Sequence, residues 1–213
     1  GMNRVRMGIQ SGSENILEFY KRPTKLRRIK KSTEILNKFK KYMMPPAYDI
    51  IVENPVETTE DTRATVDMLY EMPRPFNLNI FALRLIPNTQ LEKDVEERGI
   101  DIPSIKKSYI TGYHRTMGNC LVFALAVCKI PLWLYKILRN KVYPVHIKQP
   151  HYPILFFVVR VSYLMKRTFD HLRFMDFSIF SGKTGYYLWK FGIIGFWKRF
   201  ILKRYRLPEA KLR

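Results

Sequence analysis

Polar side chains that suit small-molecule recognition gather at three strand-to-helix corners. Residues 10–13 supply an amide and two hydroxyls directly after a short apolar stretch. Residues 49–54 bring a carboxylate to the end of a second stretch, and residues 87–89 follow a third. Ligands of parallel α/β folds bind at the carboxyl ends of strands, on the loops that lead into helices. These corners are therefore expected to line one polar cleft, suited to a ribose, an amino-acid group and an adenine edge.

A purely structural role explains the first corner equally well. Gly8 and Gly12 would relieve a tight change of direction, and Ser13 would cap the helix that follows. Residue chemistry alone leaves both interpretations open.

Alternating strands and helices must position these corners. The patterning predicts strands over residues 5–10, 48–52 and 78–85, and helices over residues 14–20, 26–43, 58–72 and 90–98. Such βα repeats build parallel sheets or barrels. Three strands alone would leave an open edge, which parallel sheets rarely tolerate, so further strands are expected before residue 1.

Three motifs resemble those of radical S-adenosylmethionine (SAM) enzymes. Residues 7–17, with residues 20–24, are similar to the family's fourth strand and helix, roughly G-[IV]-[EQ]-S-G-[SD]-x3-L followed by N/K-R-x-[TS]. Residues 49–61 resemble the fifth strand and its loop, and residues 85–91 resemble the end of the sixth. The resemblance covers about residues 1–100. It implies an α/β fold: the second half of a partial (β/α)6 TIM-like barrel.

The resemblance also implies cofactor-binding residues. Gln10 matches the position that commonly hydrogen-bonds the SAM ribose, and Ser11 is a weaker match beside it. Arg22 matches an arginine that reaches the SAM carboxylate or ribose, and Asp49 matches an acid that contacts SAM in some members. Each has a simpler alternative: Arg22 is then a solvated cation at a helix end, and Asp49 pairs with a neighbouring basic residue.

The sequence departs from the family pattern in three places. Glu53 stands where the family usually has glycine, and its bulk is expected to crowd the approach of SAM. Asn88 also replaces a glycine, but asparagine tolerates a positive φ. The C-x3-C-x2-C run that holds the family's [4Fe-4S] cluster does not occur. Cys120 and Cys128 have the wrong spacing, so the cluster ligands are expected upstream of residue 1.

Charge divides the chain into two predicted domains. Residues 1–101 carry 17 Lys/Arg against 15 Asp/Glu, whereas residues 102–213 carry 21 against 3. The second region is aromatic-rich, is expected to be mostly helical, and contains no apolar run that reaches the ~20 residues of a spanning helix. Such a region favours an anionic partner. The four histidines are scattered through it and predict no metal site.

These features predict the C-terminal part of a radical SAM enzyme, inactive alone and similar to members with an N-terminal cobalamin-binding domain. The resemblance implies reductive cleavage of SAM by a [4Fe-4S] cluster, giving a 5′-deoxyadenosyl radical for hydrogen abstraction or, with cobalamin, methyl transfer. Expected partners are the N-terminal remainder of the enzyme, a small-molecule or lipid-like substrate and an anionic membrane surface, with nucleic acid less favoured. The expected location is cytoplasmic, peripheral at the inner membrane face. The alternative is a non-catalytic membrane-peripheral or nucleic-acid-binding protein on a degenerate half-barrel.

Overall fold

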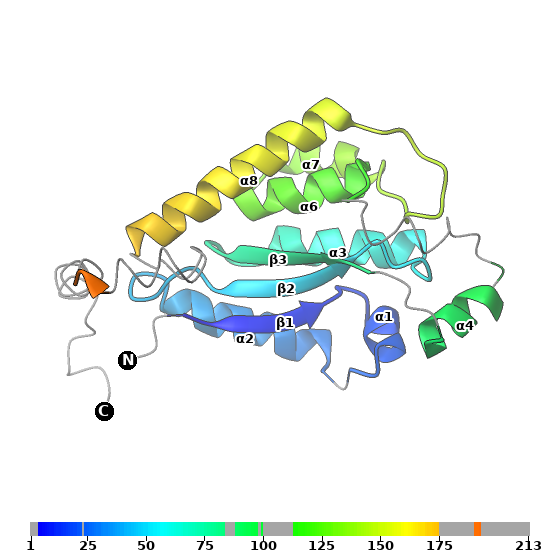
Figure 1. Ribbon diagram of the computed structural model, residues 1–213, viewed down its shortest axis with the longest axis horizontal. Coiled ribbons are helices and arrows are strands. Elements are labelled where there is room, and N and C mark those ends of the chain that lie inside the picture. Colours follow the sequence, from blue (N-terminus) through cyan, green and yellow to red (C-terminus); the bar gives the residue numbers. More distant parts are fainter. Residues whose placement is uncertain are drawn as a thin grey trace.

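The protein is a mixed α/β structure built on a small parallel sheet (Figure 1). The computed structural model describes residues 4–22, 24–83, 88–97, 99, 113–174 and 190–192. The strands β1 (Arg6–Gln10), β2 (Ala47–Val52) and β3 (Asn77–Ala82) lie in the order β1-β2-β3. The three predicted strands are thus confirmed, although the predicted end of the third extends into residues 84–85, which lie outside the described residues.

Four helices follow the strands at the predicted places: α1 (Glu14–Phe19), α2 (Leu26–Lys38), α3 (Thr59–Glu71) and α4 (Gln90–Glu97). Ser13 caps α1, and Thr58 and Asp61 form a capping box at the start of α3. The predicted end of α2 at residue 43 is wrong. The helix stops at Lys38 because i→i+3 turns follow, with the Phe39 and Lys40 N–H groups bonding the Leu36 and Asn37 carbonyls.

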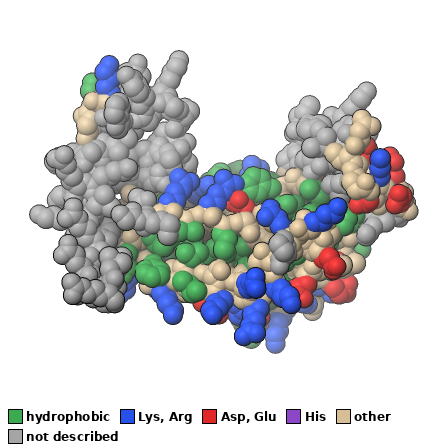
Figure 2. Space-filling model, turned by 90° about the horizontal axis from the view of Figure 1, so that it is seen from below, with side chains coloured by type: hydrophobic (Ala, Val, Ile, Leu, Met, Phe, Trp, Pro, Cys, Tyr) green, Lys and Arg blue, Asp and Glu red, His purple; other side chains and the backbone are tan. Residues whose placement is uncertain are grey.

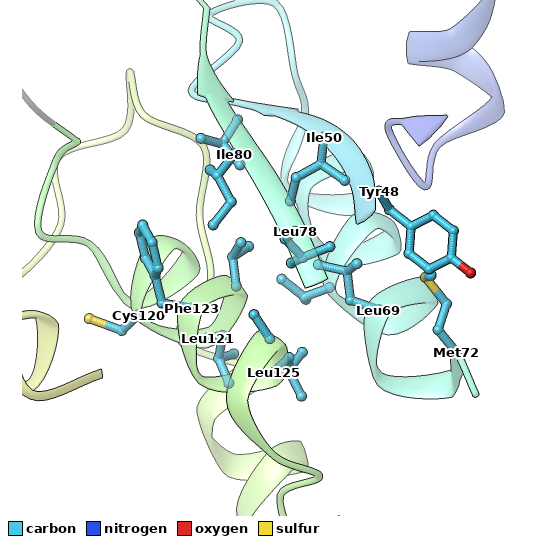
Figure 3. Close-up of a cluster of buried hydrophobic side chains, with 14 of the residues drawn as sticks. Tyr48, Ile50, Leu69, Met72, Leu78, Ile80, Cys120, Leu121, Phe123 and Leu125 are labelled. Carbon is cyan, nitrogen blue, oxygen red and sulfur yellow. The ribbon is translucent and has the colours of Figure 1, made fainter. Parts of the chain in front are cut away.

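One hydrophobic cluster joins the sheet to the C-terminal helices. Tyr48, Ile50, Leu78 and Ile80 pack with α3 and with α6 (Met117–Val127) (Figure 3). Nearly every residue of α6 is buried, which accounts for its continuous apolar sequence. The regions before and after residue 101 therefore share a core. Residues 100–112, where the predicted domain boundary falls, lie outside the described residues, so the division stays a prediction.

The apolar run of residues 120–138 forms two helices, because the chain leaves the helix at Cys128 and Pro131 precedes the next one. α7 (Leu132–Arg139) is tied to α3 through the Asp67 carboxylate. Asp67 accepts two hydrogen bonds from Arg139, at 2.6 and 2.5 Å, and one from the Tyr135 hydroxyl at 2.5 Å. The described part of the second region is thus mostly helical, as expected.

The helix α8 (Pro153–Arg173) lies on α6, and side chains from its C-terminal half reach the outer edge of β3 (Figure 1). The outward carbonyl of Phe76 accepts a hydrogen bond from Lys166 Nζ at 3.0 Å, and that of Leu78 accepts one from the Tyr163 hydroxyl. Tyr113, just before α6, donates to the Ile80 carbonyl at 2.6 Å. Side-chain donors therefore take the place of a further strand at this edge.

Among the described helices, none combines the length and apolar character required to traverse a bilayer.

Candidate functional site

The strands place alternate side chains on two different faces of the sheet. The face formed by Tyr48, Ile50, Leu78 and Ile80 is buried in the core and is called the closed face here. The other face, called the open face, carries Arg6, Gly8, Asp49, Asn79 and Phe81. Because the strands are parallel and in register, Gly8, Asp49 and Asn79 lie side by side across it.

A row of hydrogen bonds crosses the open face. The Arg6 Nε donates to both Asp49 carboxylate oxygens, at 2.8 and 2.9 Å, and the Asn79 amide donates to the same carboxylate at 2.7 Å. The Arg167 guanidinium of α8 donates to the Asn79 Oδ1 at 2.9 Å. Asp49 therefore pairs with a neighbouring basic residue, the simpler alternative considered for it, and is held in a fixed orientation.

Gln10 lies over the same face because of an irregularity at the end of β1. The register shifts between Gly8 and Gln10, and Gln10 has a φ of 73°. A Cβ added at Gly8 would come within 2.7 Å of the Gln10 Nε2, so the amide lies over Gly8, next in the sheet to Asp49. Gln10 and Asp49 thus occupy neighbouring positions on the open face.

Ser11 belongs to a buried junction with α3. Its hydroxyl has no exposed surface and lies 3.1 Å from the Thr65 hydroxyl, which also accepts a hydrogen bond from the Gly12 N–H at 3.0 Å. Ser13 donates to the Asp61 carboxylate at 2.5 Å. A Cβ at Gly12 would approach the Ala64 carbonyl oxygen to 2.5 Å, so only glycine fits this contact. The structural role considered for Gly12 and Ser13 is therefore present.

Arg22 lies apart from the open face. It is exposed in the turn after α1 and lines an open cavity of about 490 Å³ with Glu14, Glu18 and Lys21. Neither Gln10 nor Asp49 lines that cavity. Of the four predicted cofactor-binding residues, the structure groups Gln10 with Asp49 and places Ser11 and Arg22 elsewhere.

Glu53 adopts the backbone conformation of a glycine, with a φ of 60°. Its carboxylate accepts hydrogen bonds from the His114 N–H at 2.6 Å and the Asn119 amide at 2.7 Å, at the start of α6. Burial raises the pKa of Glu53, but the bonds from His114 and Asn119 outweigh it and leave the pKa below its usual value. Asn88 also has a positive φ, of 66°, as its residue type allows.

A cavity of about 430 Å³ between the open face and α8 was not predicted from the sequence. Arg6, Asn79 and Phe81 line it from the sheet, and Arg160 and Arg167 line it from α8. Two signals were present in the sequence: Asn79 interrupts an apolar strand, and the two arginines lie seven residues apart, on one side of a helix.

Metal ligands do not converge in the described part of the chain: no group of three His, Cys, Asp or Glu side chains there suits an ion. Cys120 is buried, and Cys128 is exposed at the end of α6. Burial raises the pKa of the Cys120 thiol to about 11, which disfavours the thiolate that metal binding needs.

Neither a known protein-family model nor a curated protein matches this chain.

Proposed function

We propose that this chain is the C-terminal part of a radical SAM enzyme, in which the open face forms one wall of the SAM site. The main support for this proposal is the backbone conformation at two positions where the sequence departs from the family motifs. Glu53 and Asn88 stand where the motifs have glycine, and both have the positive φ that glycine adopts most readily. The loops thus keep a glycine-type backbone although the side chains differ, which supports the resemblance independently of residue identity.

In this proposal each open-face residue has a defined task. The Gln10 amide, which offers both a donor and an acceptor, binds the ribose hydroxyls. Asp49 accepts hydrogen bonds, and its bonds from Arg6 and Asn79 keep its orientation fixed before SAM arrives. The crowding expected at Glu53 is reduced because its carboxylate is bonded to His114 and Asn119.

The described residues do not fit a [4Fe-4S] cluster, since Cys120 is buried in the core and Cys128 lies eight residues further along. The proposal therefore assigns the cluster ligands, the remaining barrel strands and any cobalamin-binding domain to sequence outside this chain. The β1 side supports this assignment: hydrophobic side chains are visible in the middle of that face, with Lys and Arg side chains around them (Figure 2). Surfaces of this kind mark sites of contact with further protein.

The test is equilibrium binding of S-adenosylhomocysteine to the full-length protein and two variants. Gln10→Ala should weaken binding about tenfold, because a buried ribose hydroxyl loses its partner. Gln10→Glu is the matched control and should bind nearly as well, since the family pattern accepts either residue. Equal binding by all three proteins, or an upstream reading frame without C-x3-C-x2-C, would overturn the proposal.

One observation favours the second candidate, a non-catalytic membrane-peripheral protein. The outer side of α8 exposes large apolar side chains at helical spacing: Ile154, Phe157, Val158, Val161, Met165 and Phe169. An amphipathic helix of this kind can lie in a headgroup layer. Flotation with phosphatidylglycerol vesicles tests it: Phe157→Ser should reduce the bound fraction severalfold, whereas Phe81→Ser, on the open face, should not. Unchanged flotation of Phe157→Ser, or salt-sensitive binding to RNA alone, would remove this candidate.

A further inference from the structure

The cavity between the open face and α8 has the size and composition of a small-molecule site. Its volume of about 430 Å³ lies within the usual range for such sites, roughly 300–1,000 Å³. Its lining combines guanidinium groups with aromatic rings, among them Phe81 and Tyr113, and every lining residue belongs to the described part of the chain.

Positive charge is in excess there. Arg6, Arg160 and Arg167 line the cavity, and its lining includes no Asp or Glu. Asp49, beside the cavity, is bonded to Arg6 and offsets one of the three charges. An anion entering the cavity would therefore meet two guanidinium groups that pair with no carboxylate of the described residues.

The three arginines differ in how fully their donors are used. Arg167 bonds the Leu78 carbonyl, the Tyr163 hydroxyl and the Asn79 Oδ1, so its guanidinium is fixed within the fold. Arg6 uses its Nε for Asp49. The Arg160 guanidinium instead lies over the Tyr113 and Phe156 rings, 5.8 and 6.0 Å from their centroids, and makes no hydrogen bond to any residue in the described ranges.

Such stacking orients a guanidinium while leaving its N–H groups available. A planar guanidinium matches the two oxygens of a carboxylate or phosphate. The neighbouring aromatic and apolar lining suits a flat hydrophobic body attached to that anion.

From this arrangement we infer that the cavity between the sheet and α8 binds an organic anion with a flat apolar body, and that Arg160 is its principal anion-binding residue. The inference stands without SAM binding. Only the further step, that such an anion is the substrate of the enzyme, rests on the proposed function.

The test is calorimetric titration of the full-length protein with 2-naphthoate and 2-naphthyl phosphate, with neutral 2-naphthol for comparison. Both anions should bind with one-site saturation, and 2-naphthol at least tenfold more weakly, because it forms no charge-assisted bond. Arg160→Gln should weaken anion binding about tenfold or more, and Arg160→Lys should restore part of it by keeping the charge without the planar fork.

Arg173→Gln is the matched control, because Arg173 is an exposed arginine of α8 that does not line the cavity. Equal weakening by Arg160→Gln and Arg173→Gln would mean that the basic surface attracts anions without a site, and would overturn the inference. Equal affinity for 2-naphthol would overturn it too. Thermal melting of each variant checks that the fold is retained. The titrations contain no SAM, so a negative result would contradict the anion site alone. A failure of S-adenosylhomocysteine binding would instead contradict the proposed function.

Discussion

Alternate residues of the same three strands form the two faces of the sheet, and the faces differ in polarity and burial. On the closed face, Tyr48, Ile50 and Leu78 are at most 1% exposed and pack against helices. On the open face, Asp49 and Asn79 hydrogen-bond to each other, and Phe81 is 45% exposed. Stability is therefore expected to depend on one face and ligand binding on the other.

The largest difference should come from truncating one apolar side chain on each face. Leu78→Ala should lower the free energy of unfolding by about 3 kcal/mol, because it removes a fully buried side chain and leaves a cavity. Phe81→Ala should cost less than about 1 kcal/mol, because that ring already meets solvent. Urea denaturation measures both. Similar losses would mean that other protein covers the open face.

Glu57 allows the stability of the buried side of the molecule to be tested by its dependence on pH. It is buried after β2 and accepts a hydrogen bond from the Thr62 hydroxyl at 3.1 Å. Burial, with a smaller contribution from the Asp61 carboxylate, raises the pKa of Glu57 to about 8 in the folded protein. The folded state therefore holds this proton more tightly than the unfolded state does, and stability falls as pH rises from about 4.5 to about 8.

Glu57→Gln should remove this pH dependence, since the amide stays neutral and can still accept the Thr62 hydrogen bond. The variant should melt at a higher temperature than the native protein near pH 8, and the gap should narrow towards pH 4.5. Melting curves across that range measure it. A constant gap between the two proteins would show that Glu57 does not titrate within the range.

The smallest effect on stability is expected from the open-face carboxylate. Asp49→Asn should shift the urea midpoint only slightly: the Asp49 side chain is 15% exposed, but its partner Arg6 is 57% exposed and the new amide oxygen can still accept the Asn79 hydrogen bond. The same variant should weaken S-adenosylhomocysteine binding. Asp67→Asn is the matched control: it loosens the tie between α3 and α7, so it should destabilise the fold without changing ligand binding. If Asp49→Asn destabilised the fold and Asp67→Asn weakened ligand binding, the assignment of ligand binding to the open face would be contradicted.

Local pattern was enough to predict the strands and most helices. The three strands are bounded by Pro, Gly or polar residues, and Ser13 and Thr58 begin helices with the capping chemistry that their sequence indicates. The end of α2 was not predictable in this way. Apolar residues continue past Lys38, but Met43 and Met44 reach the core from a turn instead of a helix.

The other features of the candidate site depend on contacts between segments that are far apart in the sequence, so they could not be predicted from local pattern. The sequence allowed Asp49 to contact a ligand or to pair with a cation, and only the sheet register shows that Arg6 is within reach. The burial of Ser11 depends on Thr65, which lies 54 residues further along. The cavity at Arg160 depends on how α8 packs on α6 and reaches the edge of β3, and no local pattern specifies that arrangement.

The covered edge of β3 determines at which end of the sheet a further strand can be added. Tyr163, Lys166 and Tyr113 already occupy the outward carbonyls there, so an incoming strand would have to displace them. β1, at the other end, has a strand partner on one side only within the described residues. Any strand supplied by another polypeptide should therefore dock beside β1. If the protein were divided into two polypeptides before β1, the two pieces should therefore associate through the β1 edge. The β3 edge should resist strand-to-strand aggregation, because its carbonyls are already bonded.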